Sequence, residues 1–448
     1  MGNFKAVTAG SGEASKPAER KRVVSGMRPT GRLHIGHYFG ALENWKRLQD
    51  AISANGKPEY ECFYFIADWH ALTSDYADSS AIAQHTIEIA IDYLAAGIDA
   101  KKVVIFQQSR VPEHAELHLL LSMVTPRGWL ERVPTYKEAL GNVKDRDLHT
   151  YGFLGYPVLQ TADIVIYSEE SAPLFVPVGE DQVSHVELSR EIVRRFNAFY
   201  GLSFLDKFNN LVELLSENPD EYSAETNLIK RWVNDIANLG EKLASADKED
   251  VFNAVRKLAS ELGVQNFLEK YDRQSEFVSF REPLTEPQVM LTKTPRIPGL
   301  DGRKMSKSYG NTITLSETDE EIRKKTKVMV TDPARKRRTD PGNPEVCPVF
   351  DWHKLFSPQE TRDWAAQGCR TAGIGCIECK AAMADHLIKW IAPIRERRLK
   401  WENDKKGVLE IIDEGSKKAR RVAQETMGQV REAVFGWEKT KKEIRNGE

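Results

Sequence analysis

The chain has 448 residues, of which 41% are hydrophobic and 29% charged, and its formal net charge is −2. This composition is typical of a soluble globular protein, and the length suffices for two or three domains. No apolar run reaches about 18 residues, which excludes a predicted membrane span, and the near-zero charge argues against nucleic-acid binding unless basic residues gather locally.

The first 205 residues predict a lead-in followed by an α/β domain with a Rossmann-like parallel sheet. Residues 1–21 are polar and lack an apolar signal core, so we expect a flexible lead-in and a cytoplasmic protein. Strand and helix patterns alternate over residues 22–205, which is typical of a parallel sheet covered by helices. Ligands in such folds bind beyond the carboxyl ends of the strands, so segments 26–37, 68–70 and 179–182 should meet in one crevice. The clearest strands are 63–67, 103–106 and 175–178, and the clearest helices are 82–96, 113–124 and 181–200.

A histidine tetrad, His-Ile-Gly-His at 34–37, follows the first strand and a Gly/Pro turn at 25–31. It opens a helical pattern, and a strand–turn–helix start directs free backbone N–H groups and the helix dipole at an anion. Gly36 lacks a side chain, so a flat ring such as adenine can lie against the backbone there. His34 and His37 can donate hydrogen bonds to phosphate oxygens. Taken alone, two histidines at helical spacing are equally compatible with ordinary surface or core residues.

Beyond residue 205 the character of the chain changes three times. Residues 206–286 are polar and mostly helical, and they read as an insertion that either packs on the first domain or contacts a partner. Residues 287–316 have the Pro- and Gly-rich chemistry of loops. Residues 317–448 are predicted to form an all-helical domain, interrupted by a Pro- and Cys-rich stretch at 332–379.

The loop region carries a second motif, Lys-Met-Ser-Lys-Ser at 304–308. It is polar and flanked by Gly302 and Gly310, so its two lysines should be mobile. Two mobile ammonium groups suit a departing pyrophosphate. A Lys/Ser loop on its own is usually a solvated turn, and the combination with the histidine tetrad is what carries the interpretation.

In this order the two motifs resemble the HIGH and KMSKS signatures of class I aminoacyl-tRNA synthetases. Four further segments, 25–37, 67–73, 156–163 and 177–182, resemble the tryptophanyl-tRNA synthetases, in particular the subgroup with additional cysteines. The resemblance covers about residues 22–205 and 287–440. It implies ATP-dependent ligation of L-tryptophan to tRNA(Trp) through a tryptophanyl-adenylate, with release of AMP and pyrophosphate. The alternatives are a tyrosyl-tRNA synthetase and a tryptophan-binding paralogue that does not charge tRNA.

Asp163 is the strongest candidate for amino-acid selection. It lies on an otherwise apolar helical pattern, and a buried carboxylate needs a partner. The ring N–H of indole is its single donor, so a selective pocket needs one acceptor between apolar walls. The residues alone leave a salt bridge to an unidentified cation equally open. The resemblance implies that Asp163 accepts the indole N–H, that Tyr156 and Gln182 hold the ammonium and carboxylate groups, and that His70 lies near the pocket, unless it is purely structural.

The same resemblance assigns the ATP site. It implies that His34, His37, Lys304 and Lys307 act on the phosphates and that Mg²⁺ accompanies them without a dedicated protein cage. The residues implied to contact ATP are Arg28, Pro29, Thr30, Gly36, His37, Gly179, Glu180, Asp181, Ile297, Lys304, Met305, Ser306, Lys307 and Ser308.

Five cysteines remain. Cys62 opens a predicted strand and is most simply a core residue, whereas Cys347, Cys369, Cys376 and Cys379 cluster in the sequence. Four clustered thiols in a cytosolic protein indicate a metal site rather than disulfides, either zinc or an iron–sulfur cluster, although scattered buried cysteines stay open. The resemblance implies a 4Fe-4S cluster. The gap between the first two ligands is one residue shorter than the family pattern, and a loop at 357–360 could absorb this difference.

The remaining expectations concern partners. The resemblance implies a homodimer that binds tRNA(Trp), and the apolar helical segments 117–124 and 153–166 are compatible either with such an interface or with ordinary core. Basic stretches at 335–338 and 417–421 are either solvated faces or RNA contacts.

Overall fold

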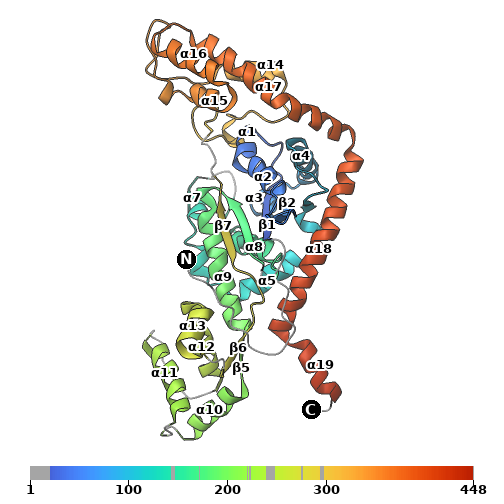
Figure 1. Cartoon of the computed structure of the whole chain (residues 1–448), viewed down its shortest axis with the longest axis vertical. Helices are drawn as coiled ribbons and strands as arrows, with labels where there is room; N and C mark the ends of the chain where they lie inside the picture. The colour runs from blue at the N-terminus through green and yellow to red at the C-terminus, as the bar shows by residue number, and fades with distance from the viewer. Residues whose placement is uncertain are drawn as a thin grey trace.

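The computed structural model describes residues 21–142, 147–170, 172–218, 220, 223–238, 248–273, 276–292 and 297–446. The predicted lead-in therefore lies outside the described residues, apart from Lys21. The described chain forms an elongated molecule with a central sheet, a helical insertion at one end and a helical C-terminal region that extends along one side (Figure 1).

Five parallel strands make the central sheet, in the order β3-β2-β1-β4-β7, which confirms the predicted Rossmann-like α/β fold. Strands β1 and β2 pair in register from Lys21↔Tyr60 to Met27↔Ile66, and each has a run of consecutive buried residues, as expected of a sheet buried on both faces. The strands are β1 Lys21–Met27, β2 Tyr60–Ile66, β3 Val104–Gln107, β4 Leu174–Val178 and β7 Pro287–Leu291.

The fifth strand, β7, was predicted to be part of a loop region, and this prediction was wrong. It pairs with β4 from Leu174↔Pro287 to Val178↔Leu291 and forms one edge of the sheet. A proline is tolerated at the first position of an edge strand, because its missing N–H faces away from the ladder. The neighbouring prolines and glycines hid a short strand whose pairing is entirely with a distant segment.

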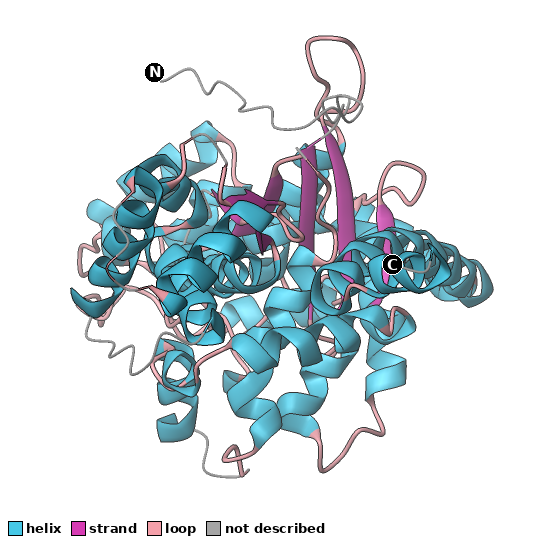
Figure 2. Cartoon of the chain, turned by 90° about the horizontal axis from the view of Figure 1, so that it is seen from below, coloured by secondary structure: helices cyan, strands magenta, loops and turns pink. Residues whose placement is uncertain are grey.

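Helices cover both faces of the sheet (Figure 2). Two of them, Ile82–Ala96 and Glu113–Val124, have the predicted bounds. The elements of this part of the chain are α1 Ile35–His37, the π-helical turn η1 Tyr38–Leu42, α2 Glu43–Gln49, α3 Asp68–Asp75, α4 Ile82–Ala96, the 3-10 turn η2 Gln108–Arg110, α5 Glu113–Val124, α6 Arg127–Leu130, α7 Pro134–Asn142, α8 Tyr151–Val165, the 3-10 turn η3 Glu180–Gln182 and α9 Val183–Tyr200.

Successive side chains along a strand point to opposite faces of the sheet, so the buried core is divided into one cluster on each face. Val23 belongs to one buried cluster, with Trp45 and Tyr64, and Val24 belongs to the other, with Phe63. Trp45 stacks on Tyr64 with ring centroids 4.4 Å apart, and the Tyr64 hydroxyl donates to the backbone carbonyl of Trp45. Burial of these large apolar side chains fixes the helices on the sheet.

The insertion forms a small helical unit with its own core. Its helices surround Trp232, which is fully buried against Phe208 and Phe267. Two short antiparallel strands, which the sequence did not predict, close its base, and α12 packs on α9. The elements are β5 Leu202–Phe204, α10 Asp206–Glu217, α11 Ala224–Asn238, α12 Lys248–Leu262, α13 Val264–Tyr271 and β6 Val278–Phe280.

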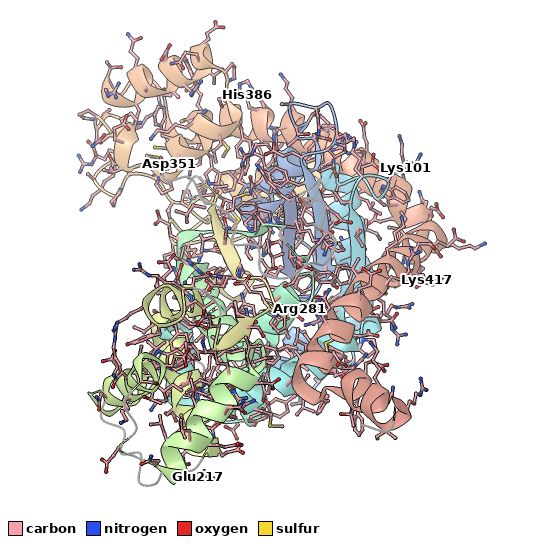
Figure 3. All side chains as sticks on the ribbon, turned by 60° about the horizontal axis from the view of Figure 1, so that its bottom comes forward. Lys101, Glu217, Arg281, Asp351, His386 and Lys417 are labelled. Atoms are coloured by element: carbon pink, nitrogen blue, oxygen red, sulfur yellow. The ribbon has the colours of Figure 1, made fainter. Side chains whose placement is uncertain are left out.

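The C-terminal region is helical, as predicted. It contains the 3-10 turn η4 Lys307–Tyr309, α14 Asp319–Lys327, the 3-10 turn η5 Pro344–Val346, α15 Pro348–Phe356, α16 Gln359–Arg370, α17 Cys376–Asn403, α18 Lys405–Phe435 and α19 Trp437–Asn446. Asp351 and His386 mark its far end, and Lys417 projects from α18 (Figure 3). In the part of the chain described, no helix is both long and apolar enough to cross a membrane.

Helix α18 covers the β3 edge of the sheet. The N–H of Gln107 donates to Ser416 Oγ at 3.3 Å, so an edge strand finds a partner on the helix. The approach is close because Gly415 has no side chain, and a Cβ there would lie 1.8 Å from the carbonyl oxygen of Ile105.

This contact predicts that Gly415→Ala lowers stability, since the helix must move away from the strand. We expect a loss of about 2 kcal/mol in the free energy of unfolding, measured as a lower midpoint of urea unfolding. Gly428→Ala is the matched control on the same helix, because nothing lies within 4 Å of a Cβ there. The control should gain about 0.5–1 kcal/mol from helix propensity. Equal effects of the two substitutions would contradict the packing described.

Candidate active site

The site lies at the carboxyl ends of the strands, where β1 is flanked by β2 on one side and β4 on the other. From β1 the sheet continues to β2 and β3 on one side and to β4 and β7 on the other. Ligands of open parallel sheets bind at the point where the strand order reverses in this way. Segments following β2 and β3 meet there, as the N–H of Trp69 donates to Gln108 Oε1 at 3.0 Å and that of Ser109 donates to Asp68 Oδ1 at 3.0 Å.

His34 and His37 form a compact pair at the start of α1. Their ring centroids are 3.7 Å apart, and the backbone N–H of His34 donates to His37 Nδ1 at 3.1 Å. A neutral His37 therefore carries its proton on Nε2. His34 is buried, and its Nδ1 has no hydrogen-bond partner among the described residues. A Cβ on Gly36 would lie 2.9 Å from His34 Cε1, so the pair requires glycine between them.

Both histidines are neutral at neutral pH. Burial, reinforced by the positive charge of Lys307, lowers the pKa of His34 to about 4. Burial, with His34 and Lys307 as further causes, lowers the pKa of His37 well below its usual value. They can therefore contribute hydrogen bonds to an anion, but not positive charge.

The lysine loop reaches the histidine turn through Lys307. Its Nζ donates to the carbonyl oxygens of Thr30 at 3.2 Å and Gly31 at 2.8 Å. Burial lowers the pKa of Lys307 to about 8, although Asp92 opposes this shift. Lys304 is exposed. The structure thus brings one of the two predicted lysines to the histidine turn.

Two sets of hydrogen bonds hold the loop in place. Residues 33–35 and 313–315 pair as a short antiparallel bridge, with Ile35 N–H donating to Ile313 at 3.0 Å and Leu315 N–H donating to Leu33 at 2.9 Å. Within the loop, the amide of the buried Asn311 accepts from Ser306 N–H at 2.8 Å and donates to Asp301 Oδ1 at 2.7 Å and to the carbonyl of Lys304 at 3.1 Å.

Asp163 is fully buried on α8 and is the centre of a polar network. His70 Nε2 lies 2.8 Å from its Oδ2, His114 Nδ1 lies 2.6 Å from its Oδ1, and Gln108 Nε2 lies 2.7 Å from both oxygens. Burial works to raise the pKa of Asp163, but the hydrogen bonds from His114 and His70 outweigh it and bring the pKa to about 2. The group is a carboxylate oriented by three side chains.

Tyr156 lies about two helical turns before Asp163 on α8 and belongs to a second cluster of hydrogen-bonded side chains. Its hydroxyl is 2.6 Å from Thr135 Oγ1 and 2.9 Å from His185 Nε2. Burial raises the pKa of Tyr156, with Thr135 and the nearby cation Arg28 opposing the shift. Tyr156 therefore lies on the helix that carries Asp163 and close to Arg28, in the turn that follows β1.

The other residues predicted to contact ATP have the following places in the structure. Gly179 follows β4 and begins the turn Glu180–Gln182, of which the side chain of Asp181 lies outside the description, as does that of Ser308. Pro29 is buried between the exposed Arg28 and Thr30. Ile297 and Met305 are buried in the core cluster that contains Leu33 and Ile35. The backbone N–H of Ser306 donates to the side chain of Asn311.

The four clustered cysteines lie together but do not form an assembled metal site. Burial, followed by the neighbouring Cys347, Cys369 and Cys376, raises the pKa of the Cys379 thiol to about 12. Yet no group of three or more His, Cys, Asp or Glu side chains among the described residues is arranged to hold a metal ion. Cys379 Sγ lies 3.4 Å from His353 Nε2, and Cys369 Sγ lies 3.9 Å from the Arg335 guanidinium.

Several residues of these networks were not predicted from the sequence. They are Gln108, His114, Thr135, His185, Asp92 and Asn311. The polar pair Gln107 and Gln108, directly after the predicted strand 103–106, was the available signal for the first of them, since ligands bind beyond the ends of strands. Arg335 was considered for RNA binding, but it is buried and donates to the carbonyls of Arg338 and Ile374.

Comparison with known proteins agrees with this geometry. The family of class I tRNA synthetases for tryptophan and tyrosine matches residues 16–218 and 247–392, and this match defines the class of the protein. A tryptophan–tRNA ligase of Ralstonia nicotianae is 48% identical over 422 residues, which cover 92% of this chain and 98% of the relative. The Thermotoga maritima ligase is 42% identical, again over 92% of this chain and 98% of the relative.

A solved structure agrees with these relatives. The tryptophanyl-tRNA synthetase of Campylobacter jejuni, complexed with ADP and tryptophan, superposes with a TM-score of 0.64 at 28% identity, covering 92% of this chain and 99% of that one. The chain therefore belongs to the tryptophan–tRNA ligases among the class I aminoacyl-tRNA synthetases. The tyrosyl alternative is not favoured by these relatives.

The hydrogen bonds of Asn311 predict that Asn311→Ala releases the lysine loop. Tryptophan-dependent ATP–pyrophosphate exchange should slow by about tenfold or more, because a misplaced loop lysine loses its position on the phosphates, while the dissociation constant for tryptophan should change by less than about twofold. Asn55→Ala is the control, since Asn55 also caps a turn, by accepting from Ser53 and Lys57, on a remote surface. Equal kinetics of both variants would refute the role of Asn311.

Proposed function

We propose that this enzyme activates L-tryptophan with ATP in the crevice between β1 and β4 and then transfers it to tRNA(Trp). The observation that carries this proposal is the arrangement of Lys307 on the histidine turn beside the helix that holds the ionised Asp163. One end of the crevice offers donors and a cation for phosphates, and the other offers an acceptor for a ring N–H.

In the first step, a carboxylate oxygen of tryptophan forms a bond to the α-phosphorus of ATP, and the bond to the bridging oxygen of the β-phosphate breaks to release pyrophosphate. The carboxylate is already a nucleophile, so no general base is needed. In the second step, the terminal ribose hydroxyl of the tRNA attacks the acyl carbon, AMP leaves and the hydroxyl proton is lost. Positioning and charge stabilisation then supply most of the rate.

The residues divide this work. His34 and His37 donate hydrogen bonds to phosphate oxygens as neutral groups, and Lys307 with the exposed Lys304 supplies positive charge to the departing pyrophosphate. Mg²⁺ accompanies the phosphates when ATP is bound. The remaining ATP contacts are provided by Arg28, Pro29, Thr30, Gly36, Gly179, Glu180, Asp181, Ile297, Met305, Ser306 and Ser308.

Tryptophan is held at both ends. Asp163 accepts the indole N–H, with His70 beside it, and Tyr156 and Gln182 hold the ammonium and carboxylate groups. The support for this assignment is that Asp163 is buried and ionised, so it offers a carboxylate acceptor held in place by His70, His114 and Gln108.

The exchange of pyrophosphate into ATP tests the substrate. Tryptophan should support the exchange, whereas tyrosine at the same concentration should not. Exchange supported by tyrosine in preference to tryptophan would overturn the assignment.

The proposed role of Asp163 predicts discrimination against an analogue without the ring donor. Replacement of the indole N–H by sulfur, in the benzothiophene analogue, should lower kcat/KM for adenylate formation by about 10–100-fold, because Asp163 loses the hydrogen bond from the ring while its donors His70, His114 and Gln108 remain. In Asp163→Asn this discrimination should collapse. Asp332→Asn is the matched control, because Asp332 is also buried but accepts only local N–H groups, including those of Ala334 and Asn343. Discrimination retained by Asp163→Asn would exclude the role.

Lys307 predicts both a rate effect and a pH effect. Lys307→Ala should slow adenylate formation by about 10²–10³-fold while tryptophan binding stays nearly unchanged. The free lysine loses its proton as the pH rises through its lowered pKa of about 8, so kcat/KM for ATP should fall above this pH. Lys307→Arg stays charged and should lack this decline. An unchanged exchange rate in Lys307→Ala would contradict the proposal.

We also propose that Cys347, Cys369, Cys376 and Cys379 hold a 4Fe-4S cluster, with Zn²⁺ as the alternative. The support is the gathering of four thiols, with Arg335 near Cys369 and Lys380 next to Cys379 to offset negative charge. A cluster would join the start of α17 to α15 and α16 and serve as a structural support beside the RNA-binding helices.

Anaerobic purification tests this proposal. Iron and sulfide should each approach about four per chain, and Cys379→Ala should lose them, whereas Cys62→Ala should keep them because Cys62 lies in the core of the sheet. Stoichiometric zinc without iron would exclude the cluster.

Finally, we propose a cytoplasmic homodimer in which the helical C-terminal region binds tRNA(Trp). Leu119 and Met123 on α5 and Tyr151 on α8 are exposed apolar side chains that suit a subunit interface. Lys417, Lys418 and Arg421 are exposed on α18 and suit the phosphates of RNA. The mass in solution tests the dimer. We also propose the domain boundaries 22–205, 206–286, 287–316 and 317–448, except that β7 at 287–291 belongs to the catalytic sheet and β5 at 202–204 belongs to the insertion.

A further inference from the structure

A buried arginine of α17 connects the C-terminal region to the catalytic sheet. Arg398 is 1% exposed and pairs with Asp92 and Glu88, one helical turn apart on α4. Its Nε also lies 3.1 Å from Glu402 Oε1 on its own helix. A guanidinium group so deeply buried is stable only when its charge is compensated, and Asp92, itself 0% exposed, depends on Arg398 in the same way.

The same carboxylates hold the histidine turn. Asp92 Oδ2 accepts from the backbone N–H of Leu33 at 2.7 Å, and Leu33 directly precedes His34. Glu88 Oε2 accepts from Arg32 Nε at 3.0 Å, so the turn is attached to α4 at two successive residues. Asp92 is also close enough to Lys307 to oppose the lowering of its pKa by burial. One buried carboxylate therefore acts on both signature motifs.

Other arginines of α17 seat the helix on the same part of the molecule. Arg397 Nε donates to the carbonyl of Ala95 at the end of α4 at 2.6 Å. Arg395 donates to the carbonyl of Glu317 at 2.9 Å, just beyond the segment that pairs with the histidine turn. Only Arg398 among these three shares an acceptor with the backbone of the turn.

We propose that Arg398 is a positioning residue for the activation of tryptophan: through Asp92 and Leu33 it places His34 for the phosphates of ATP, so that the seating of α17 on α4 sets the rate of adenylate formation. The inference rests on the proposed roles of His34 and Lys307. It makes α17, which leads from the cysteine cluster to the long helix α18, a part of the phosphate site.

The test compares three variants of the full-length enzyme by tryptophan-dependent ATP–pyrophosphate exchange, tryptophan binding and thermal melting. Arg398→Met removes the guanidinium and keeps a long apolar side chain. Asp92→Asn combined with Arg398→Met removes the charges of Arg398 and Asp92, while Glu88 keeps its ion pair with Arg32 and an amide oxygen remains to accept from Leu33. Arg22→Met is the control, because Arg22 is also buried and paired, with Glu61 and Glu169, at the opposite end of β1.

We expect Arg398→Met to lower kcat/KM for ATP by about tenfold or more, with the dissociation constant for tryptophan changed by less than about twofold. The double variant should regain much of the melting temperature lost by Arg398→Met, because no unpaired charge stays buried, but not the exchange rate. Arg22→Met should melt earlier with nearly unchanged kinetics.

Recovery of exchange together with the melting temperature in the double variant would overturn the inference, because the pair would then be purely structural. Exchange in Arg398→Met equal to that of Arg22→Met would overturn it as well. A parent enzyme without tryptophan-dependent exchange would instead overturn the proposed function on which the inference rests.

Discussion

The short antiparallel pairing of residues 33–35 with 313–315 is the constraint on which the rest of the site depends. Backbone hydrogen bonds at Ile35 and Leu315 fix the segment that follows the lysine loop against the segment that contains His34. Because both ends of this contact are anchored, the loop between the bridge and β7 can bring Lys307 onto the turn at Thr30 and Gly31. The sheet supplies the frame, and this pairing brings the two distant motifs together.

The electrostatics of the site agree with a role in binding anions. His34 and His37 are neutral because they are buried near Lys307, and burial lowers the pKa of Lys307 itself to about 8 although Asp92 opposes this shift. The phosphates of ATP would raise the pKa of Lys307, since negative charge stabilises the protonated lysine. At the other end, Asp163 is kept as a carboxylate by donors from His70, His114 and Gln108. In the proposed function, the end with His34, His37 and Lys307 suits the phosphates of ATP, and the end with Asp163 suits the indole ring of tryptophan.

Much of this was predictable from the sequence, and the parts that were not share a physical reason. The strand and helix pattern of the first 205 residues, including the bounds of α4 and α5, followed from local hydrophobic periodicity. The two signature motifs are contiguous, so their side chains could be named in advance. By contrast, β7 is specified by its partner β4 and begins with a proline, which local patterns read as a loop.

The hydrogen-bond and ion-pair partners of the predicted residues could not be identified from the sequence, because tertiary packing brings them from other elements. Asp163 is flanked by Gln108 and His114 from other elements, and Arg398 meets Asp92 across two domains. Single-sequence reasoning detects that a buried carboxylate needs a partner, but not which side chain arrives there. The cysteine cluster illustrates the converse, as sequence spacing grouped four thiols that the fold does gather, while their contacts with His353 and Arg335 come from the fold alone.

The central claim is that this crevice activates tryptophan for transfer to tRNA. It is tested most directly by charging a tRNA(Trp) transcript with labelled tryptophan in the presence of ATP and Mg²⁺. The account predicts accumulation of tryptophanyl-tRNA, with no charging of the same transcript by tyrosine. Formation of the adenylate without any charged tRNA would contradict it and indicate a tryptophan-binding protein that has lost the second step.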